Sequence, residues 1–195
     1  MSVVLGIETS CDESSAAIVR YRPDSIEVLS CATFSQIEIH RPYGGVVPEI
    51  ASRNHLETIN PMIEEALRDA GMRPDALDAI AITNRPGLVG ALLVGVSAAK
   101  SMAYAVGKPL VPVHHLEGHA TSIFLHSTGK TPVARNELPY PMLIAVVSGG
   151  HTNLPIATGP PELWPLDFLK RSLVGRSRDD AAGEPLDVGR RLVEV

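Results

Sequence analysis

The sequence predicts an α/β fold, in which a sheet is flanked by helices. Three short apolar runs joined by tight connections open the chain at residues 2–8, 16–21 and 26–36, and they predict an antiparallel meander of strands. Two long helical patterns follow and alternate with further apolar runs. The chain has 195 residues, 45% of them hydrophobic, which is enough to bury one substantial core or two small ones.

Two helices are predicted after the meander, over residues 49–70 and 88–106. In the first helix the apolar residues recur at helical spacing, Pro61 is expected to split or kink the helix, and Gly71 suits the cap of its carboxyl end. The second helix is apolar nearly all round and rich in glycine and alanine. It is therefore expected to be buried against another surface.

The later part of the chain is predicted to continue this alternation. Strands are expected at 77–83 and 110–114, and a helix at 116–126. The polar, proline-containing segment 127–141 is the best candidate for a boundary between two lobes. Beyond it, residues 142–157 repeat the strand–turn–strand pattern of the opening hairpin, which hints at a second copy of one architecture.

The composition argues against several classes of protein. Seventeen basic against 22 acidic side chains disfavour binding of nucleic acid by bulk charge, although a local basic patch or a basic partner would still suffice. Two cysteines, Cys11 and Cys31, do not form a disulfide scaffold, so a reducing cytoplasm is the default. The amino terminus has no features of a signal peptide, and the most apolar run, 88–99, is too short to span a bilayer. A soluble protein is therefore expected.

The stretch VHHLEGHA, residues 113–120, is the clearest candidate for a metal site. His115 and His119 are four positions apart, so on a helix their rings share one face and can share a metal ion. Glu117 lies about 200° around the helix from His115, which argues against a metalloprotease. A metal site needs three or four ligands, and only two are visible here. Spacing alone therefore favours a metal site and a structural role, in which the histidines bond to the backbone or to one another, about equally.

Two turns of small and polar residues are further candidates for ligand contacts. The first, residues 9–15, carries Asp12 and Glu13; it could orient a metal, a water or an amine, but a solvated acidic hairpin is the simpler explanation. The second, SGGHT at 148–152, exposes backbone N–H groups that could cradle phosphate, as any tight hairpin also would. Such loops gather at one edge of the sheet in α/β folds, so together they favour a nucleotide-type site.

Six motifs in this order resemble the TsaD family of tRNA threonylcarbamoyladenosine-forming proteins. They are GIETSCDESSAAIV, YGGVVPEIASRNH, RPGLVGALLVG, PVHHLEGH, VVSGGHTNL and DDAAGE. The resemblance implies an actin-like ATPase (ASKHA) fold, a mixed sheet with flanking helices in each of two lobes. It implies that residues 1–130 form a complete first lobe and that residues 131–195 begin a second, incomplete relative to the family.

The resemblance implies an acyltransferase of tRNA modification. The family transfers threonylcarbamoyl from threonylcarbamoyl-AMP to N6 of the adenosine next to the anticodon. A Lewis-acidic metal and backbone N–H groups would stabilise the charge that develops as AMP leaves. Because the family continues through a late aspartate that supplies a third protein ligand to the metal, this chain is expected to have little or no activity alone.

The resemblance also assigns roles to residues by position. His115 and His119 look like two ligands of one divalent metal ion, iron or zinc. Asp12 and Glu13 fall on an acidic hairpin implicated in activity. The nucleotide, threonylcarbamoyl-AMP or an ATP-type ligand, is expected to contact Val146, Val147, Ser148, Gly149, Gly150 and Asp187.

The implied partners are tRNA, a TsaB-like sister subunit and a TsaE-like ATPase, with no membrane. The helices at 49–70 and 88–106 resemble the face that packs on the sister subunit. The main alternative is a non-catalytic scaffold subunit of the same modification complex, which would lack the histidine pair. A sugar or acetate kinase-like enzyme would need a catalytic aspartate, for which no separate signal is present.

Several residues depart from the family pattern, and three of them are expected to change the structure. Arg85 replaces a glycine and is expected to crowd its loop. Pro155 is expected to interrupt a strand because it has no N–H for the ladder. Pro185 disfavours helix next to Asp187, so the aspartate is expected to lose its usual direction.

Overall fold

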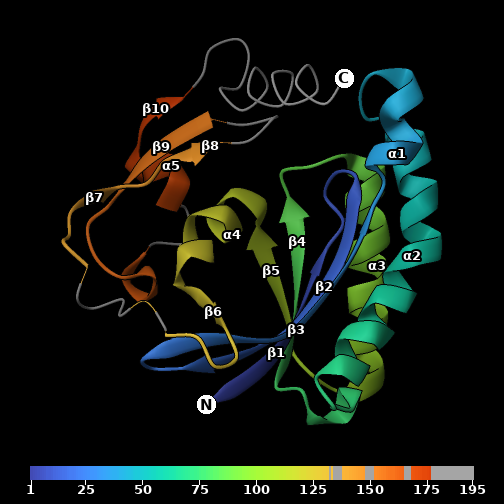
Figure 1. Cartoon of the computed structure of the whole chain (residues 1–195), viewed down its shortest axis with the longest axis horizontal. Coiled ribbons are helices and arrows are strands. Elements are labelled where there is room, and N and C mark those ends of the chain that lie inside the picture. Colours follow the sequence, from blue (N-terminus) through green and yellow to red (C-terminus); the bar gives the residue numbers. More distant parts are fainter. Residues whose placement is uncertain (132, 134–137, 148–151, 165–167, 177–195) are drawn as a thin grey trace. The chain divides into compact units, whose positions relative to one another are not determined.

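The computed structural model describes residues 1–131, 133, 138–147, 152–164 and 168–176 (Figure 1). It forms two compact units. The first consists of Met1–His115 and Phe124–Val133, and the second of Leu116–Ile123 and Ala134–Val195. Each unit has its own sheet and its own hydrophobic core.

The first unit opens with the predicted meander, which is confirmed. Strands β1 (Ser2–Glu8), β2 (Glu13–Arg22) and β3 (Ser25–Ser35) pair antiparallel in chain order. Alternate residues of β1 point into the core, because successive side chains of a strand face opposite sides of the sheet.

Three parallel strands extend this meander to a six-stranded mixed sheet. Strand β4 (Ala79–Arg85) pairs with β1, β5 (Leu110–His114) pairs with β4, and β6 (Leu125–Ser127) pairs with β3. The order is β5-β4-β1-β2-β3-β6. Because β1, β4 and β5 are parallel, their carboxyl ends lie at one edge of the sheet, where α/β folds bind their ligands.

Helices α2 (Pro48–Asp69) and α3 (Val89–Val106) run side by side along one face of this sheet (Figure 1). Of the two effects expected of Pro61, a split or a kink, the split does not occur. Pro61 is exposed on the solvent side of a helix that continues through it, where its missing N–H leaves no buried polar group unpaired. Gly71 follows the helix at φ 63°, which confirms it as the residue of the carboxyl-terminal cap.

Helix α3 connects β4 to β5 and packs on the sheet through small residues. Ala91, Gly95, Ala99 and Ala103 form its buried stripe. The expected burial against another surface is confirmed for this stripe, whereas Tyr104 on the opposite face is 92% exposed. The sequence predicted that the apolar run 88–99 is too short to cross a bilayer. In the structure the helix is longer: α3 has 18 residues and a mean hydropathy of 1.5, the length and composition of a membrane-spanning helix. A helix that covers a sheet has the same apolar composition, and α3 packs against β4, β1 and α2.

The predicted helix over 116–126 is shorter than expected. Helix α4 occupies His115–Thr121, a 3-10 turn follows at Ser122–Phe124, and the chain then enters β6. The helical pattern ends because the backbone pairs with β3, Ile26 opposite Leu125. Further short helices in the first unit are α1 (Ile37–His40), and 3-10 turns at Arg41–Tyr43 and Pro74–Ala76.

Besides most of α4, the second unit contains a small sheet and the short helix α5 among its described residues. Its elements are β7 (Met142–Leu143), β8 (Val146–Val147), β9 (Thr152–Ala157), a 3-10 turn (Pro161–Leu163), α5 (Phe168–Ser172) and β10 (Leu173–Arg176). Strand β9 pairs with β7, β8 and β10, all antiparallel. Leu116 and Ala120 of α4 join its core.

The expectation that Pro155 interrupts its strand is wrong. Strand β9 runs through this buried residue. The pairing with β10 is irregular next to it, between Leu173 and Gly175, and such an irregularity accommodates a residue without an N–H. The Pro155 carbonyl still accepts a hydrogen bond from the Ile144 N–H, at 2.9 Å.

Candidate functional site

The candidate site of the first unit lies where three parallel strands end. Strand β1 ends at Glu8, β4 at Arg85 and β5 at His114. His115 follows directly as the first residue of α4, so the sheet places a carboxylate and an imidazole at the same edge.

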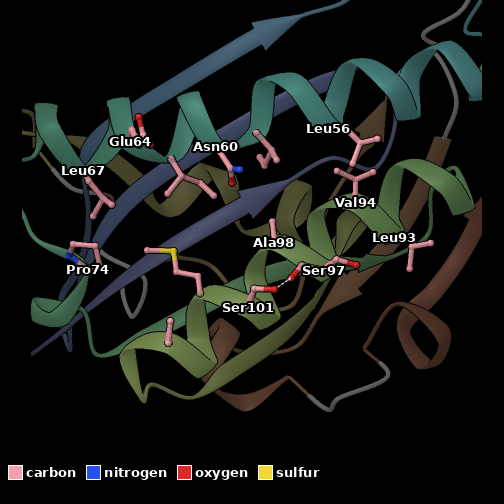
Figure 2. A pocket seen from close by; sticks show the side chains of 14 residues that line it. Leu56, Asn60, Glu64, Leu67, Pro74, Leu93, Val94, Ser97, Ala98 and Ser101 are labelled. Carbon is pink, nitrogen blue, oxygen red and sulfur yellow. Dashed lines mark hydrogen bonds between the residues drawn. The ribbon is translucent and has the colours of Figure 1, made fainter.

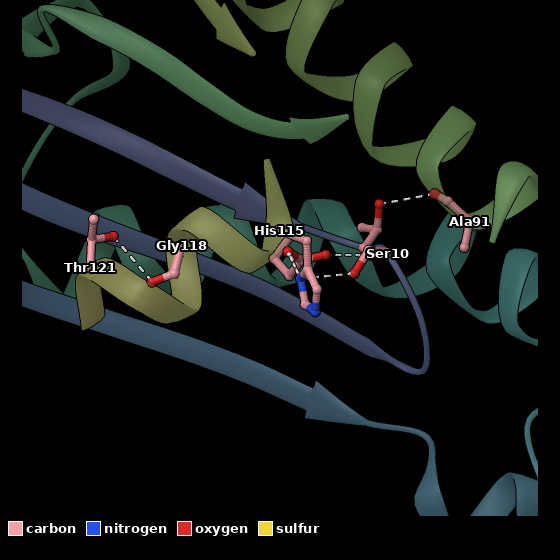
Figure 3. A network of polar contacts seen from close by, with 7 residues as sticks. Ser10, Ala91, His115, Gly118 and Thr121 are labelled. Atoms are coloured by element: carbon pink, nitrogen blue, oxygen red, sulfur yellow. Dashed lines mark hydrogen bonds and ion pairs between the residues drawn. The ribbon is translucent and has the colours of Figure 1, made fainter. Parts of the chain in front are cut away.

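The side chains of Glu8 and His115 touch at this edge. His115 Nδ1 lies 3.1 Å from Glu8 Oε2 and 3.2 Å from Ser10 Oγ (Figure 3). The Ser10 backbone N–H donates to the other carboxylate oxygen, Glu8 Oε1. Both side chains are partly buried, with 22% of His115 and 31% of Glu8 exposed. The carboxylate is therefore held from two sides by residues 107 and two positions away in sequence.

The surroundings keep the Glu8 carboxylate ionised. Burial raises its pKa, but hydrogen bonds from His115, Ser10 and Thr83 outweigh that effect and lower the pKa to about 2. Near neutral pH Glu8 is thus an acceptor only, and the atom that it contacts must supply the hydrogen.

Helix α3 and the loop before it fix the segment that carries Ser10. The Leu88 N–H donates to the Ser10 carbonyl at 2.8 Å, and Thr9 Oγ1 donates to the Ala91 carbonyl at 2.9 Å. Gly87 packs so closely that an added Cβ would lie 2.6 Å from the Ser10 carbonyl oxygen. A glycine is required at this position because the two backbones approach each other.

The acidic turn follows on the same segment. Asp12 lies in the turn between β1 and β2, where its carbonyl accepts from the Gln36 N–H at 2.9 Å. Glu13 is the first residue of β2 and is exposed. Between Glu8 and Asp12, desolvation and the nearby carboxylates raise the pKa of the Cys11 thiol to about 12.

A buried chain of hydrogen bonds supports this turn from below. His55 of α2, fully buried, donates from Nε2 to the Cys11 carbonyl at 3.0 Å. Its Nδ1 accepts from Ser14 Oγ at 2.7 Å and faces Gln36 Nε2 at 3.3 Å. Both ring nitrogens are therefore used inside the protein. Burial lowers the pKa of His55, against the opposing effects of the Cys11 carbonyl and of the carboxylates of Glu8 and Asp12.

The chain continues to the start of α2. His40 Nε2 donates to Gln36 Oε1 at 3.2 Å, and His40 Nδ1 accepts from the Val47 N–H at 3.3 Å. Val47 is the N-cap residue of α2. The hydrogen bonds thus run in one direction, from the Val47 N–H through His40, Gln36 and His55 to the Cys11 carbonyl. This direction requires both imidazoles to carry their hydrogen on Nε2 and a lone pair on Nδ1.

The second histidine of the predicted metal pair, His119, lies on α4 one turn after His115 and is exposed. Within the part of the chain that the structure describes, no group of three His, Cys, Asp or Glu side chains is arranged to hold a metal ion. The donor types still fit iron or zinc, because two imidazoles at i,i+4 suit either metal and a ligating histidine ordinarily donates its other N–H to a carboxylate.

The predicted nucleotide-binding residues are described only in part. Val146 is buried in the core of the second unit and Val147 is 48% exposed, both in β8. Ser148, Gly149, Gly150, Asp187 and Pro185 lie outside the described residues. The expectation that Arg85 crowds a loop is wrong, because Arg85 ends β4 with an exposed side chain.

Sequence reasoning singled out His115 but missed Glu8, Ser10 and His55. One signal was available for Glu8, since a carboxylate at the end of an apolar strand is a candidate ligand contact in an α/β fold. The partners of His55 carried no such signal. They come from β2, from the residue that follows β3 and from the turn after β1, and only the folded sheet brings these together around α2.

Comparison with known proteins agrees with this architecture. A tRNA N6-adenosine threonylcarbamoyltransferase from Magnetococcus marinus is 51% identical over 194 residues, which cover 97% of this chain and 51% of that protein. One from an Anaeromyxobacter species is 52% identical over 190 residues, covering 97% and 51%. The chain thus spans about half the length of these curated relatives.

Among solved structures, YeaZ from Pseudomonas aeruginosa matches 95% of this chain and 68% of its own chain with a TM-score of 0.50 at 17% identity, a likeness of fold that agrees with the actin-like architecture. The model of the family TsaD, tRNA N6-adenosine threonylcarbamoyltransferase, matches residues 27–194. The chain therefore belongs to the TsaD family.

Proposed function

We propose that this chain is part of an acyltransferase that moves threonylcarbamoyl from threonylcarbamoyl-AMP to N6 of the adenosine next to the anticodon of tRNA. The observation that carries the proposal is the contact of His115 with Glu8 at the carboxyl edge of the parallel strands, in a chain of this family. Because the chain spans about half the length of its relatives, we expect little transferase activity from it alone.

His115 and His119 would hold one divalent metal ion, iron or zinc. When bound, the metal would act as a Lewis acid toward the carbamoyl or phosphate oxygens. The rest of the proposed chemistry is positioning. The acidic turn with Asp12 and Glu13 would orient the attacking amine, a weak nucleophile for which orientation contributes more than a shifted pKa. The segment that follows Val146 and Val147 would bind the adenylate through Ser148, Gly149 and Gly150, with Asp187 on the ribose.

The groove between α2 and α3 would bind a TsaB-like sister subunit. Its volume is about 890 Å³, and apolar side chains of both helices line it (Figure 2). Leu56 of α2 and Leu93 of α3 are 65% and 64% exposed at this groove. Exposed apolar side chains clustered on one face mark a surface for protein contact.

The catalytic proposal is tested with a chimera that carries residues 1–195 in place of the matching half of the Magnetococcus marinus relative. Threonylcarbamoyladenosine is measured by mass spectrometry of digested tRNA after incubation with threonylcarbamoyl-AMP and the sister subunit. We expect product from the chimera and a loss of at least about 100-fold in His115→Ala, the range for removal of one group that stabilises transition-state charge. Equal product from both would contradict the role of His115, and robust turnover by residues 1–195 alone would contradict the need for the remaining length.

A scaffold subunit of the same complex is the alternative. It predicts an inactive but folded chimera that still binds the sister subunit. The docking face itself is tested by Leu93→Glu, which should abolish binding, with Glu57→Lys, an exposed site on α2, as the control. We further propose that the protein works in the cytoplasm, with a TsaE-like ATPase as an additional partner.

A further inference from the structure

The imidazole of His115 can face a metal with only one of its two nitrogens, a choice that matters if the metal site proposed above exists. A neutral imidazole carries hydrogen on one nitrogen and a lone pair on the other, and only the lone pair can bind a metal. Which nitrogen carries the hydrogen depends on the hydrogen bond that holds the ring.

The contacts of His115 decide this choice. Its Nδ1 faces Glu8 Oε2 at 3.1 Å and Ser10 Oγ at 3.2 Å. An ionised carboxylate only accepts, so Glu8 favours hydrogen on Nδ1, and the Ser10 hydroxyl can accept a hydrogen bond from the same N–H. The lone pair of the neutral ring then lies on Nε2.

We propose that Glu8 and Ser10 are positioning residues that hold the His115 ring with its hydrogen on Nδ1, so that Nε2 is the atom offered to the metal. The carboxylate is itself fixed, because the Ser10 N–H and Thr83 also bond to it. Ser10 is held in turn through Leu88 and the close packing of Gly87. The ring is thus oriented by the end of β1 and by the loop before α3.

The contrast with the other glutamate of this segment sharpens the assignment. Glu13, at the start of β2, is exposed, whereas Glu8 points to the imidazole from the end of β1. The carboxylate that matters for the metal is therefore the one in GIE, five positions before Glu13, and its effect is exerted through His115.

The test measures the ring directly and then the metal. Long-range proton–nitrogen spectra of the metal-free chain, at a pH where the His115 ring is neutral, report which nitrogen carries the hydrogen, with His115→Ala identifying the signals. We expect the Nδ1–H form in the wild type, a shift toward Nε2–H in Glu8→Ala, and an intermediate result in Glu8→Gln, since the amide can both accept and donate. Ser10→Ala should shift the ring less, because the carboxylate remains.

Zinc affinity is then measured by competition with a chelator. Loss of an outer partner of a ligating histidine weakens metal binding by about 10–100-fold, so we expect that loss in Glu8→Ala and a smaller one in Glu8→Gln. Glu57→Ala on α2 removes an exposed carboxylate as the matched control and should leave the affinity unchanged. Glu8→Gln keeps the side-chain volume and serves if Glu8→Ala does not fold.

The outcomes separate this inference from the metal site itself. If the wild type binds zinc through His115 and the Glu8 variants keep both the Nδ1–H form and the affinity, the positioning role is overturned and the site stands. If the wild type binds no zinc, or binds it equally in His115→Ala, the metal site falls, and the ring spectra alone decide whether Glu8 sets the tautomer.

Discussion

Two histidines of the first unit, His55 and His115, differ in what the fold leaves them able to do. His55 is completely buried and uses both ring nitrogens, one toward the Cys11 carbonyl and one toward Ser14. His115 lies at the sheet edge, partly exposed, with Nδ1 directed to a carboxylate. One short segment, residues 8–14, thus contacts both histidines. Glu8 at its start contacts His115, and Cys11 and Ser14 further along it bond to His55.

The difference shows how partners assign a role to the same side chain. In the His55 chain every donor meets a neutral acceptor, so the network fixes one arrangement of the turn and would lose bonds if a ring gained a proton. Glu8 stays ionised beside His115, so that imidazole is oriented by charge at a place where ligands bind. His55 therefore supports the turn, and His115 belongs to the candidate functional site.

The largest effect is expected from breaking the buried network. His55→Ala leaves the Cys11 carbonyl and Ser14 without their partner and opens a cavity under the sheet, so the free energy of unfolding should fall by about 2–4 kcal/mol. His119→Ala on the exposed face of α4 is the matched histidine control and should change it by less than about 0.5 kcal/mol. Urea unfolding of both variants measures the difference, and equal values would refute the supporting role of His55.

The same network predicts a pH dependence. Burial lowers the pKa of His55, so the unfolded chain takes up a proton at a higher pH than the folded protein. This contribution to stability is complete above the unfolded histidine pKa of about 6.5 and is lost as the pH falls below it, by up to about 1.4 kcal/mol per pH unit. Stability measured from pH 7.5 to 5.5 should fall more in the wild type than in His55→Gln.

A smaller loss is expected where the loop before α3 meets Ser10. In Gly87→Ala the new Cβ would lie 2.6 Å from the Ser10 carbonyl oxygen and 2.7 Å from its Cβ, so a backbone must move at a cost of about 1–3 kcal/mol. Gly118→Ala on α4 is the control, since its Cβ meets nothing within 4 Å and alanine favours helix by up to about 1 kcal/mol. If thermal unfolding ranks the two variants the other way, the close packing at Ser10 is not present.

The charge of Glu8 predicts an acid-dependent contribution of similar or smaller size. Its folded pKa of about 2 is below the ordinary value of 4.5, so the stabilisation is complete above pH 4.5 and is lost as the pH falls through 2. The shift corresponds to at most about 3 kcal/mol, which solvent screening of a side chain 31% exposed reduces to about 1–2 kcal/mol. The stability difference between wild type and Glu8→Gln should therefore shrink from pH 5 to pH 2, and a constant difference would rule out this cause.

The smallest effect is expected on the reactivity of the Cys11 thiol. Cys11 lies between Glu8, which contacts His115, and the residues that bond to His55. With a thiol pKa raised to about 12, only about one thiol in ten thousand is ionised at pH 8, so alkylation should be slow although the residue is exposed. Asp12→Asn removes a carboxylate that raises this pKa and should speed the reaction. Rates for Cys11 are followed by mass spectrometry in Cys31→Ser, and an unchanged rate in the Asp12 variant would contradict the electrostatic cause.

The hydrophobic pattern predicted the elements of the first unit well because each has a regular period. The three meander strands and both long helices appear close to their predicted bounds. Strand β6 was missed because three residues are too few for a period and their pairing partner in β3 lies about 100 residues earlier. The prediction for Pro155 was wrong because the sequence around it does not show that the neighbouring strand, β10, pairs irregularly at this point. That irregularity removes the need for an N–H at Pro155.

By itself, the sequence determined the strand–helix order, the spacing of His115 and His119 and membership of the family, because these depend on residues near in sequence or on the order of motifs. Only the tertiary structure decided that Glu8 backs His115 and that His55 closes on the turn around Cys11. Those contacts join residues 107 and 44 positions apart. The first contact exists because crossover connections bring the ends of parallel strands to one edge of the sheet. The second exists because α2 packs on β2 beside the turn after β1, and no local pattern encodes either contact.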